Sequence, residues 1–310
     1  MYGFSTGWNI RRHSKIARVL DEIRKLGFQQ VELAGLTEPQ MREAVSLRER
    51  GAAPEIVGLH SFCPLPPVGR RASFGDLLDL ASRDHAERRQ AVEYTRRTID
   101  CAAELNAQVV IIHLGSVEVD YVPRTLLGWM TTYGPDSDEY RRRVGGLLTE
   151  RARRAAPHLD AAMEGLSELE AHARASGVKL GVENRFMYYQ IPNIAELREI
   201  LSQFGDDTAV GYWHDIGHAH MNKILRVEDQ TTVAEDIKRR MIGVHIHDVV
   251  MDANVHPAKV DHRAPSTGTV DFVRERENVS DGVLKVVELR REVGSADVVK
   301  GLAYLRRIGF

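Results

Sequence analysis

The sequence has few of the features that mark secreted, membrane-spanning or nucleic-acid-binding proteins. Its 310 residues include only two cysteines, Cys63 and Cys101, which lie far apart, so no disulfide framework is indicated. No apolar run is long enough for a membrane span, and the first residues lack the basic-then-apolar order of a secretory signal. A net charge of −2 offers no strong positive field to a phosphate backbone. We therefore expect a cytoplasmic protein that does not act on membranes and for which nucleic acid is a disfavoured partner.

Glycine-rich phosphate-binding motifs are also missing, whereas short β-branched runs are frequent. Eight candidate strands lie at residues 1–7, 29–35, 54–62, 107–116, 177–185, 208–215, 241–250 and 282–290. Helical patterns separate most of them, and strands that alternate with helices pair in parallel. A doubly wound sheet would usually show GxGxxG after its first strand, so eight such units favour a closed (β/α)8 TIM barrel. We predict one domain over residues 1–310.

Two connections depart from a regular barrel. The segment 117–146 is longer than a normal link between strand and helix, and we expect it to be a loop elaboration over the C-terminal mouth, either a lid or a surface excursion. The segment 271–285 leaves little room for a full helix between the seventh and eighth strands. The barrel is therefore expected to be thinly covered there.

Ionisable side chains recur where the predicted strands end. These residues are His60, His113, Glu183, Asp215 with His218, His245 with His247, and Glu288. In a TIM barrel, functional side chains project from the C-terminal ends of the strands, so all of them would meet at one mouth. A single buried histidine is more often structural than a ligand. Six consecutive strands that end in such groups predict a site.

The acidic members of this group indicate a metal. Burying several carboxylates together without a cation raises their pKa values and costs several kcal/mol. A divalent ion would allow Glu183, Asp215 and Glu288 to stay ionised together, and a neutral imidazole from His245 would complete a mixed oxygen and nitrogen shell. Three carboxylates with one imidazole admit Mn, Mg, Co or Zn. The alternative is a set of salt-bridged carboxylates at the barrel rim.

Five motifs together resemble the xylose isomerase-like TIM-barrel superfamily. They are GVENR at 181–185, HDIGH at 214–218, GVHIHD at 243–248, DHRAPSTGTVDF at 261–272 and VVELR at 286–290. The superfamily contains sugar and sugar-phosphate isomerases and epimerases, inosose dehydratase and endonuclease IV. The resemblance covers nearly the whole chain. The resemblance implies an enzyme, but it does not identify the substrate.

The resemblance also implies roles for particular residues. The shared ligands of one divalent metal ion would be Glu183, Asp215, His245 and Glu288, and in the ketose 3-epimerase branch the two glutamates also transfer protons on opposite sides of the substrate. His247 faces the same way as His245, so either histidine could be the ligand. We prefer His245, because the superfamily motif usually has an acid three residues after the histidine, and Asp248 stands at that position.

The implied function is isomerisation or epimerisation of a sugar or sugar derivative through an enediolate. Loss of a β-substituent from the same intermediate would make the enzyme a dehydratase or lyase. Substrate hydroxyls would be bound by His60, His113, His218 and Glu32, while Arg263, and also Arg185, could anchor an anionic group. No basic cluster marks a phosphate site, so an unphosphorylated carbohydrate is favoured. Barrel enzymes of this kind often pair through loops at the mouth, so a homo-oligomer is also compatible.

A rival hypothesis is a multinuclear zinc phosphodiesterase that acts on abasic DNA, as endonuclease IV does. The additional ligands of that enzyme would match His60, His113, His218 and the region of Asp261. The last motif departs from the endonuclease, which has aspartate, arginine, histidine where this chain has Asp261, His262, Arg263. It looks more like the isomerase loop, with Ser266 and Thr267 in place of the usual glycine and glutamate. A third hypothesis, a barrel with a decayed site, is weakened because none of the four core ligand positions is missing.

Overall fold

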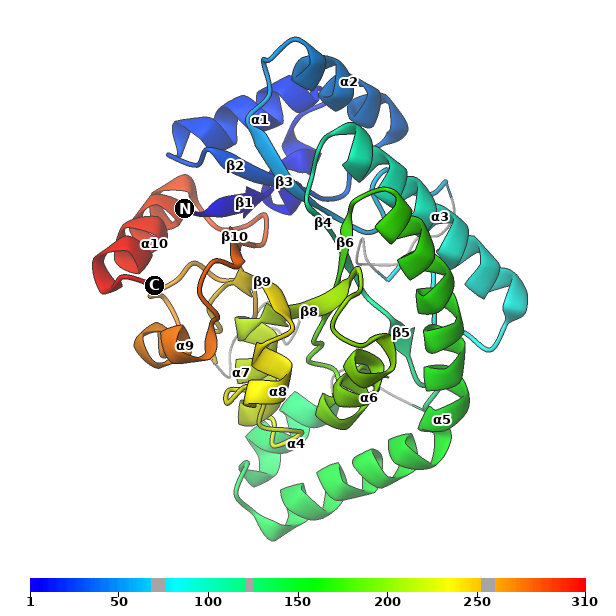
Figure 1. Ribbon diagram of the computed structural model, residues 1–310. Helices are drawn as coiled ribbons and strands as arrows, with labels where there is room; N and C mark the ends of the chain where they lie inside the picture. Colours follow the sequence, from blue (N-terminus) through cyan, green and yellow to red (C-terminus); the bar gives the residue numbers. More distant parts are fainter. Residues whose placement is uncertain (68–75, 121–124, 252–259) are drawn as a thin grey trace.

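The computed structural model describes residues 1–67, 76–120, 125–251 and 260–310, and its eight predicted strand regions form one closed parallel barrel (Figure 1). The barrel strands are β1 (Gly3–Ser5), β2 (Gln30–Leu33), β3 (Glu55–His60), β4 (Val109–Ile112), β6 (Lys179–Glu183), β8 (Val210–Asp215), β9 (Met241–Ile246) and β10 (Leu284–Val287). Strand β1 pairs with both β2 and β10, which closes the barrel. The predicted (β/α)8 fold is confirmed.

Helices surround the barrel and connect its strands (Figure 1). They are α1 (Ile16–Lys25), α2 (Glu38–Glu49), α3 (His85–Glu104), α4 (Thr125–Tyr133), α5 (Asp138–Ala175), α6 (Ile194–Phe204), α7 (Ile216–Ile224), α8 (Glu235–Lys238), α9 (Phe272–Asn278) and α10 (Ser295–Ile308), with two 3-10 turns at Thr6–Trp8 and Ile10–Arg12. The amphipathic helix α1 illustrates the packing, since Ile16, Val19, Leu20 and Ile23 are buried on one face. Within the described ranges, no helix could cross a membrane.

The segment 117–146 is more regular than the expected loop. It contains α4 and the beginning of α5, whose N-cap Ser137 accepts a hydrogen bond from the backbone N–H of Tyr140. Just before it, β5 (Gly115–Ser116) pairs antiparallel with β7 (Gln190–Ile191). The Tyr140 hydroxyl donates to the carbonyl of Leu225, directly after α7, at 2.9 Å. The elaboration is therefore a largely helical insertion fastened to the end of α7.

The inside of the barrel is built in layers because successive side chains on a strand point to opposite faces. A compact apolar cluster inside the barrel consists of Val57, Val109, Ile111, Trp213 and Val286. Residues two positions further along these and neighbouring strands form the next inward-facing layer toward the C-terminal mouth. Thus Ile111 is followed by His113, Trp213 by Asp215, and Val286 by Glu288. The strand pleat itself places polar groups directly above an apolar floor.

Trp213 fills this floor only because its neighbours lack side chains. A Cβ added at Gly243 on β9 would lie 2.0 Å from the indole, and one added at Gly181 on β6 would lie 3.2 Å from it. The Trp213 ring packs edge-on against the His245 imidazole, with centroids 5.1 Å apart. The indole therefore supports the polar layer directly from below.

The helix between β9 and β10 is short, as expected, since α9 has only seven residues. Its Glu275 is buried and accepts a hydrogen bond from the Asn278 amide at 3.0 Å. Burial raises the pKa of Glu275 to about 7, and the bond from Asn278 and the charge of Arg274 only partly oppose this effect. The folded protein therefore holds this proton more tightly than the unfolded chain does.

This shift predicts a pH-dependent stability difference for Glu275→Gln. The stabilisation from the raised pKa is complete below the unfolded value of 4.5 and is lost as the pH rises through about 7. At pH 8 the glutamine variant should thus be more stable than the wild type by about 1–2 kcal/mol, and the gain should vanish near pH 4.5. Thermal unfolding across this pH range measures the effect. The exposed Glu277→Gln on the same helix is the control, and an equal, pH-independent change in both variants would contradict the assignment.

Candidate metal centre

Four predicted ligands converge at the C-terminal end of the barrel. Glu183, Asp215, His245 and Glu288 each offer one atom to a group whose members lie within 4.8 Å of one another. The first two end β6 and β8, His245 lies near the end of β9, and Glu288 directly follows β10. The Nδ1 atom of His245 lies 3.1 Å from a Glu183 oxygen and 3.2 Å from a Glu288 oxygen. Four neighbouring strands thus place three carboxylates and one imidazole close together at the barrel mouth.

Arg185 and the neighbouring histidines keep these carboxylates ionised. Burial alone would raise the pKa of Glu183, but Arg185 and His113 hold it well below its usual range. Burial likewise opposes the ionisation of Asp215, yet His218 and His247 lower its pKa to about 2. Ionised oxygen donors beside an imidazole are a ligand set that suits a divalent cation.

The second nitrogen of His245 is held by Glu32. The Nε2 atom lies 2.9 Å from a Glu32 oxygen, and both side chains are fully buried. The Nε2–H donates to the Glu32 carboxylate oxygen, which leaves Nδ1 facing Glu183 and Glu288. The other oxygen of Glu32 is buried without a partner in the described residues. Glu32, which we expected to bind a substrate hydroxyl, therefore lies beneath His245 and has no exposed surface.

Asp215 both ends β8 and begins α7. One of its oxygens accepts from the backbone N–H of His218 at 2.7 Å, which makes it the N-cap of the helix. A Cβ at Gly217 would lie 1.9 Å from the His247 ring. The glycine of the HDIGH motif therefore leaves the space that this imidazole occupies. His247 Nε2 then reaches Asp215 at 3.0 Å. The neighbouring His214 faces away from the mouth, and burial lowers its pKa to about 4.

A second potential ligand group adjoins the first. It consists of Asp215, His218, His247 and His262. The His247 and His262 rings stack with centroids 4.0 Å apart, and His262 Nε2 lies 3.4 Å from a Glu288 oxygen. His218 Nδ1 contacts the carbonyl of Asn184, whereas its Nε2 is buried without a partner in the described residues. The structure thus places His245 with the first group and His247 with the second.

His60 and His113 line a third group together with Glu183. His113 Nε2 lies 2.8 Å from a Glu183 oxygen, and His60 Nε2 lies 3.6 Å from the same oxygen. The guanidinium of Arg185 also enters this group, with Nη1 2.6 Å from His113 Nε2 and 3.1 Å from that Glu183 oxygen. The opposite nitrogen of His113 bonds to Asp76 at 2.8 Å. Sequence reasoning did not find Asp76, which carries no motif and lies far from the strand ends in sequence.

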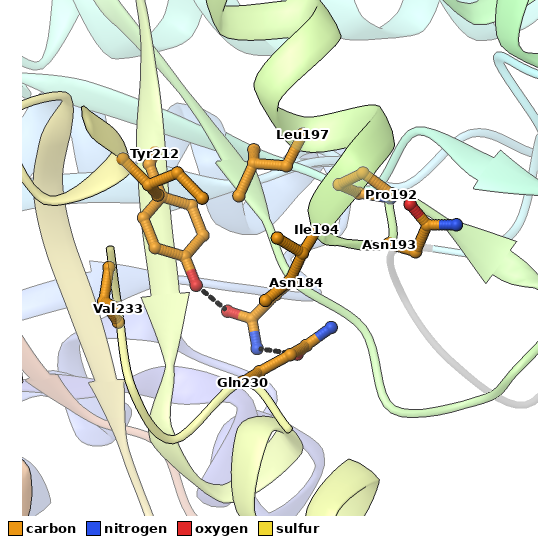
Figure 2. Close-up of a pocket in the computed structure, with 9 residues that line it drawn as sticks. Asn184, Pro192, Asn193, Ile194, Leu197, Tyr212, Gln230 and Val233 are labelled. Carbon is orange, nitrogen blue, oxygen red and sulfur yellow. Dashed lines mark hydrogen bonds between the residues drawn. The ribbon is translucent and has the colours of Figure 1, made fainter. Parts of the chain in front are cut away.

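Asn184 fixes the junction between the ends of β6 and β8. Its side-chain oxygen accepts from the Tyr212 hydroxyl and from the backbone N–H of Asp215, at 3.0 and 2.6 Å. Its amide nitrogen donates to the Asp215 carbonyl and to Gln230. Figure 2 shows the bonds from Tyr212 and to Gln230 beside a small pocket next to α6. The asparagine of GVENR therefore locks the end of β6 to the end of β8, a role that its place in the motif could have suggested.

The segment 260–271 is shaped by Asp248. Its carboxylate accepts from the backbone N–H groups of Val249, Gly268 and Val270, while its own backbone pairs with that of Arg263. Arg263 is half-buried, and its guanidinium has no hydrogen bond or ion pair with the residues that the structure describes. Ser266 adopts a φ of 74°, which glycine accepts more readily. The serine thus takes the backbone conformation that fits the glycine usual at this position.

The closed barrel and the residues at its mouth define the class of protein. The profile of the Xylose isomerase-like TIM barrel family matches residues 20–308, and the chain belongs to this family. The uncharacterized protein MJ1311 of Methanocaldococcus jannaschii is 26% identical over 237 residues, which cover 74% of this chain and 67% of that protein.

Solved structures share the fold over nearly the entire chain. A D-tagatose 3-epimerase-like protein superposes with a TM-score of 0.64 and 21% identity, covering 99% of this chain and 96% of that one. An IolI protein with a zinc atom bound gives a TM-score of 0.66 at 14% identity, with 99% and 98% covered. A 3-keto-D-glucoside 4-epimerase from E. coli gives 0.64 at 15% identity, with the same coverage. At these identities the similarity establishes the fold.

The contact between Glu32 and His245 predicts how Glu32→Gln changes metal binding. The variant keeps the shape of the side chain but removes the negative charge that orients the imidazole and makes it more basic. Loss of such a partner typically weakens metal affinity by about 10–100-fold. Competition with a chromophoric chelator measures the affinity. Glu55→Gln, at the exposed N-terminal end of the adjacent strand, is the control. Equal affinities in the two variants would contradict this role for Glu32.

Proposed function

We propose that this protein is a divalent-metal-dependent isomerase or epimerase that acts on a sugar or sugar derivative through an enediolate. The proposal rests chiefly on the convergence of Glu183, Asp215, His245 and Glu288 at the barrel mouth. The donor set fits a divalent cation, since each residue can offer an oxygen or nitrogen atom and Glu32 holds His245 from behind. When bound, the cation supplies positive charge that favours loss of a proton next to a carbonyl group. The solved sugar epimerases of the same fold support this choice of chemistry.

Proton transfer is assigned to the two glutamates. Burial opposes ionisation of Glu288, but His245 and His262 hold its pKa well below the usual range, so it is present as a base. Glu183 is ionised as well and is held by Arg185. One carboxylate would remove the proton beside the carbonyl group, and the other, after taking up a proton from solvent, would donate it on the opposite face to complete an epimerisation. Return to the neighbouring carbon would instead give isomerisation.

Substrate binding is assigned to side chains around this centre. His60, His113 and His218 lie next to Glu183 and Asp215. The Nε2 atoms of His60 and His218 can bond to hydroxyl groups, whereas both ring nitrogens of His113 are bonded to Arg185 and Asp76, so His113 would act by positioning these groups. Arg263 lies in the segment that follows β9 and can bind a polar or anionic substituent. Loss of a β-hydroxyl from the same enediolate would turn the reaction into a dehydration. Product analysis separates these outcomes.

The second candidate is a multinuclear zinc phosphodiesterase that acts on abasic DNA. It is favoured by the two further ligand groups beside the first, those of His60 and His113 and of His218, His247 and His262. The guanidinium of Arg185 argues against it, because it contacts both His113 and Glu183, which a phosphodiesterase of this kind would use to hold a zinc ion. We therefore rank the carbohydrate enzyme first.

Metal content per chain provides the first test. Elemental analysis of protein purified without chelator should find a divalent ion that is lost in Asp215→Ala, because this change removes a ligand. About three zinc ions per chain, with cleavage of an abasic-site oligonucleotide, would instead support the phosphodiesterase. If neither protein binds metal even after reconstitution, both proposals are wrong.

Solvent exchange tests the proton-transfer roles. In deuterium oxide, the metal-loaded enzyme should introduce deuterium beside the carbonyl group of its keto-sugar substrate, and NMR spectroscopy of a keto-sugar panel detects this even without net turnover. Glu183→Gln and Glu288→Gln should each lower the exchange rate by about 10²–10⁴-fold, while Glu199→Gln on the exposed face of α6 should not change it. Exchange at the wild-type rate in both site variants would remove the assigned acid and base.

A further inference from the structure

Arg185 lies among metal-ligating side chains, although an arginine cannot bind a cation. Its side chain is only 9% exposed, so the guanidinium is enclosed and does not extend into solvent. Two of its contacts are ligand-type atoms, His113 Nε2 at 2.6 Å and a Glu183 oxygen at 3.1 Å from Nη1. Asp76 lies 3.8 Å from Nη2 and so partners both Arg185 and His113. These contacts hold the guanidinium against two members of the third ligand group, His113 and Glu183.

The direction of the hydrogen bonds follows from what each group can donate. A guanidinium has donors only, so His113 Nε2 must accept from Arg185. The proton of the neutral imidazole is then on Nδ1, from which it is donated to the Asp76 carboxylate. In this tautomer the lone pair of Nε2 accepts from the guanidinium, and the Glu183 oxygen beside it accepts from the same Nη1. A metal ion could take the place of the guanidinium on both atoms. Asp76 thus prepares His113 to bind a cation, and the cation bound there is the guanidinium.

The spacing of the surrounding atoms is near that of the ligands around a metal ion. Ligands about 2.1 Å from a tetrahedral metal are separated from one another by about 3.4 Å. Here the shared Glu183 oxygen lies 2.8 Å from His113 Nε2 and 3.6 Å from His60 Nε2. Two histidines and one carboxylate are a common ligand set for zinc.

We propose that Arg185 is a built-in cation that occupies a latent zinc site formed by His60, His113 and Glu183, and that it thereby excludes one metal ion from the centre. A dication in this space would meet both the bulk and the positive charge of the guanidinium. The inference shares Glu183 with the proposed function, but it concerns the number of metal ions and does not depend on which reaction the enzyme catalyses. Removing the guanidinium should convert the group into a metal site.

The test compares zinc content in Arg185→Met and in the wild type. Each full-length protein, with the metal it carries from purification, is dialysed against dilute zinc and its metal content is measured. The methionine variant should bind one more ion per chain than the wild type, whatever number the wild type binds. The double variant Arg185→Met/His60→Ala should return to the wild-type number, because a ligand of the new site is missing. Anomalous scattering from zinc-soaked crystals of Arg185→Met should place the additional ion between His60, His113 and Glu183.

A matched control separates opening of this site from a general change in charge. Arg263→Met removes a positive charge from the same mouth of the barrel without vacating the third ligand group, so it should bind no additional zinc. A gain in Arg263→Met, no gain in Arg185→Met, or an ion already bound at this position in the wild type would each overturn the inference. Arg185→Gln serves as a second variant if Arg185→Met does not fold. The proposed function would fail in a different way, through absence of the ion that Asp215→Ala removes.

Discussion

The mouth of this barrel depends on balancing negative charge that the fold buries. Glu32, Glu183 and Asp215 are completely buried, and Glu288 is only 18% exposed at its side chain. Carboxylates brought this close together repel one another and lose hydration, which is tolerated only where cations or hydrogen-bond donors compensate. The histidines and Arg185 provide this compensation in the structure, and it explains why nearly every polar contact in the mouth joins an acid to a ring nitrogen or a guanidinium.

Much of this arrangement could be predicted from the sequence because it follows from the strand pleat. The β-branched runs gave the position of all eight barrel strands, and the ionisable residues at their ends had to meet at one mouth once the barrel closed. Alternation also placed Glu183 and His245 on the inside of their strands, two residues beyond Gly181 and Gly243. A pattern of period two is local, so it can be read without knowledge of the rest of the fold.

Other features could not be predicted, because they depend on contacts between distant segments. Asp76 bonds to His113 from a segment 37 positions away, and no periodicity marks it. Glu32 ends its strand like the other acids, yet only the three-dimensional packing shows that it lies under His245. The insertion at 117–146 was expected to be a loop elaboration because it is longer than a normal link, and the structure instead forms α4 and the start of α5 there. These residues are specified by tertiary packing, and their roles appear only after the barrel is assembled.

The contact between Trp213 and His245 bears on how an enzyme of this architecture can diversify. The indole is enclosed by glycines of two strands and touches the imidazole that the proposed metal would use. A change in the floor is therefore transmitted to the centre within one van der Waals contact, and few substitutions there can be neutral. By contrast, the helical insertion lies outside this stack and can vary without disturbing it. New substrate preferences in such a lineage should therefore arise through substitutions in peripheral segments, while Trp213 and the glycines around it stay nearly invariant.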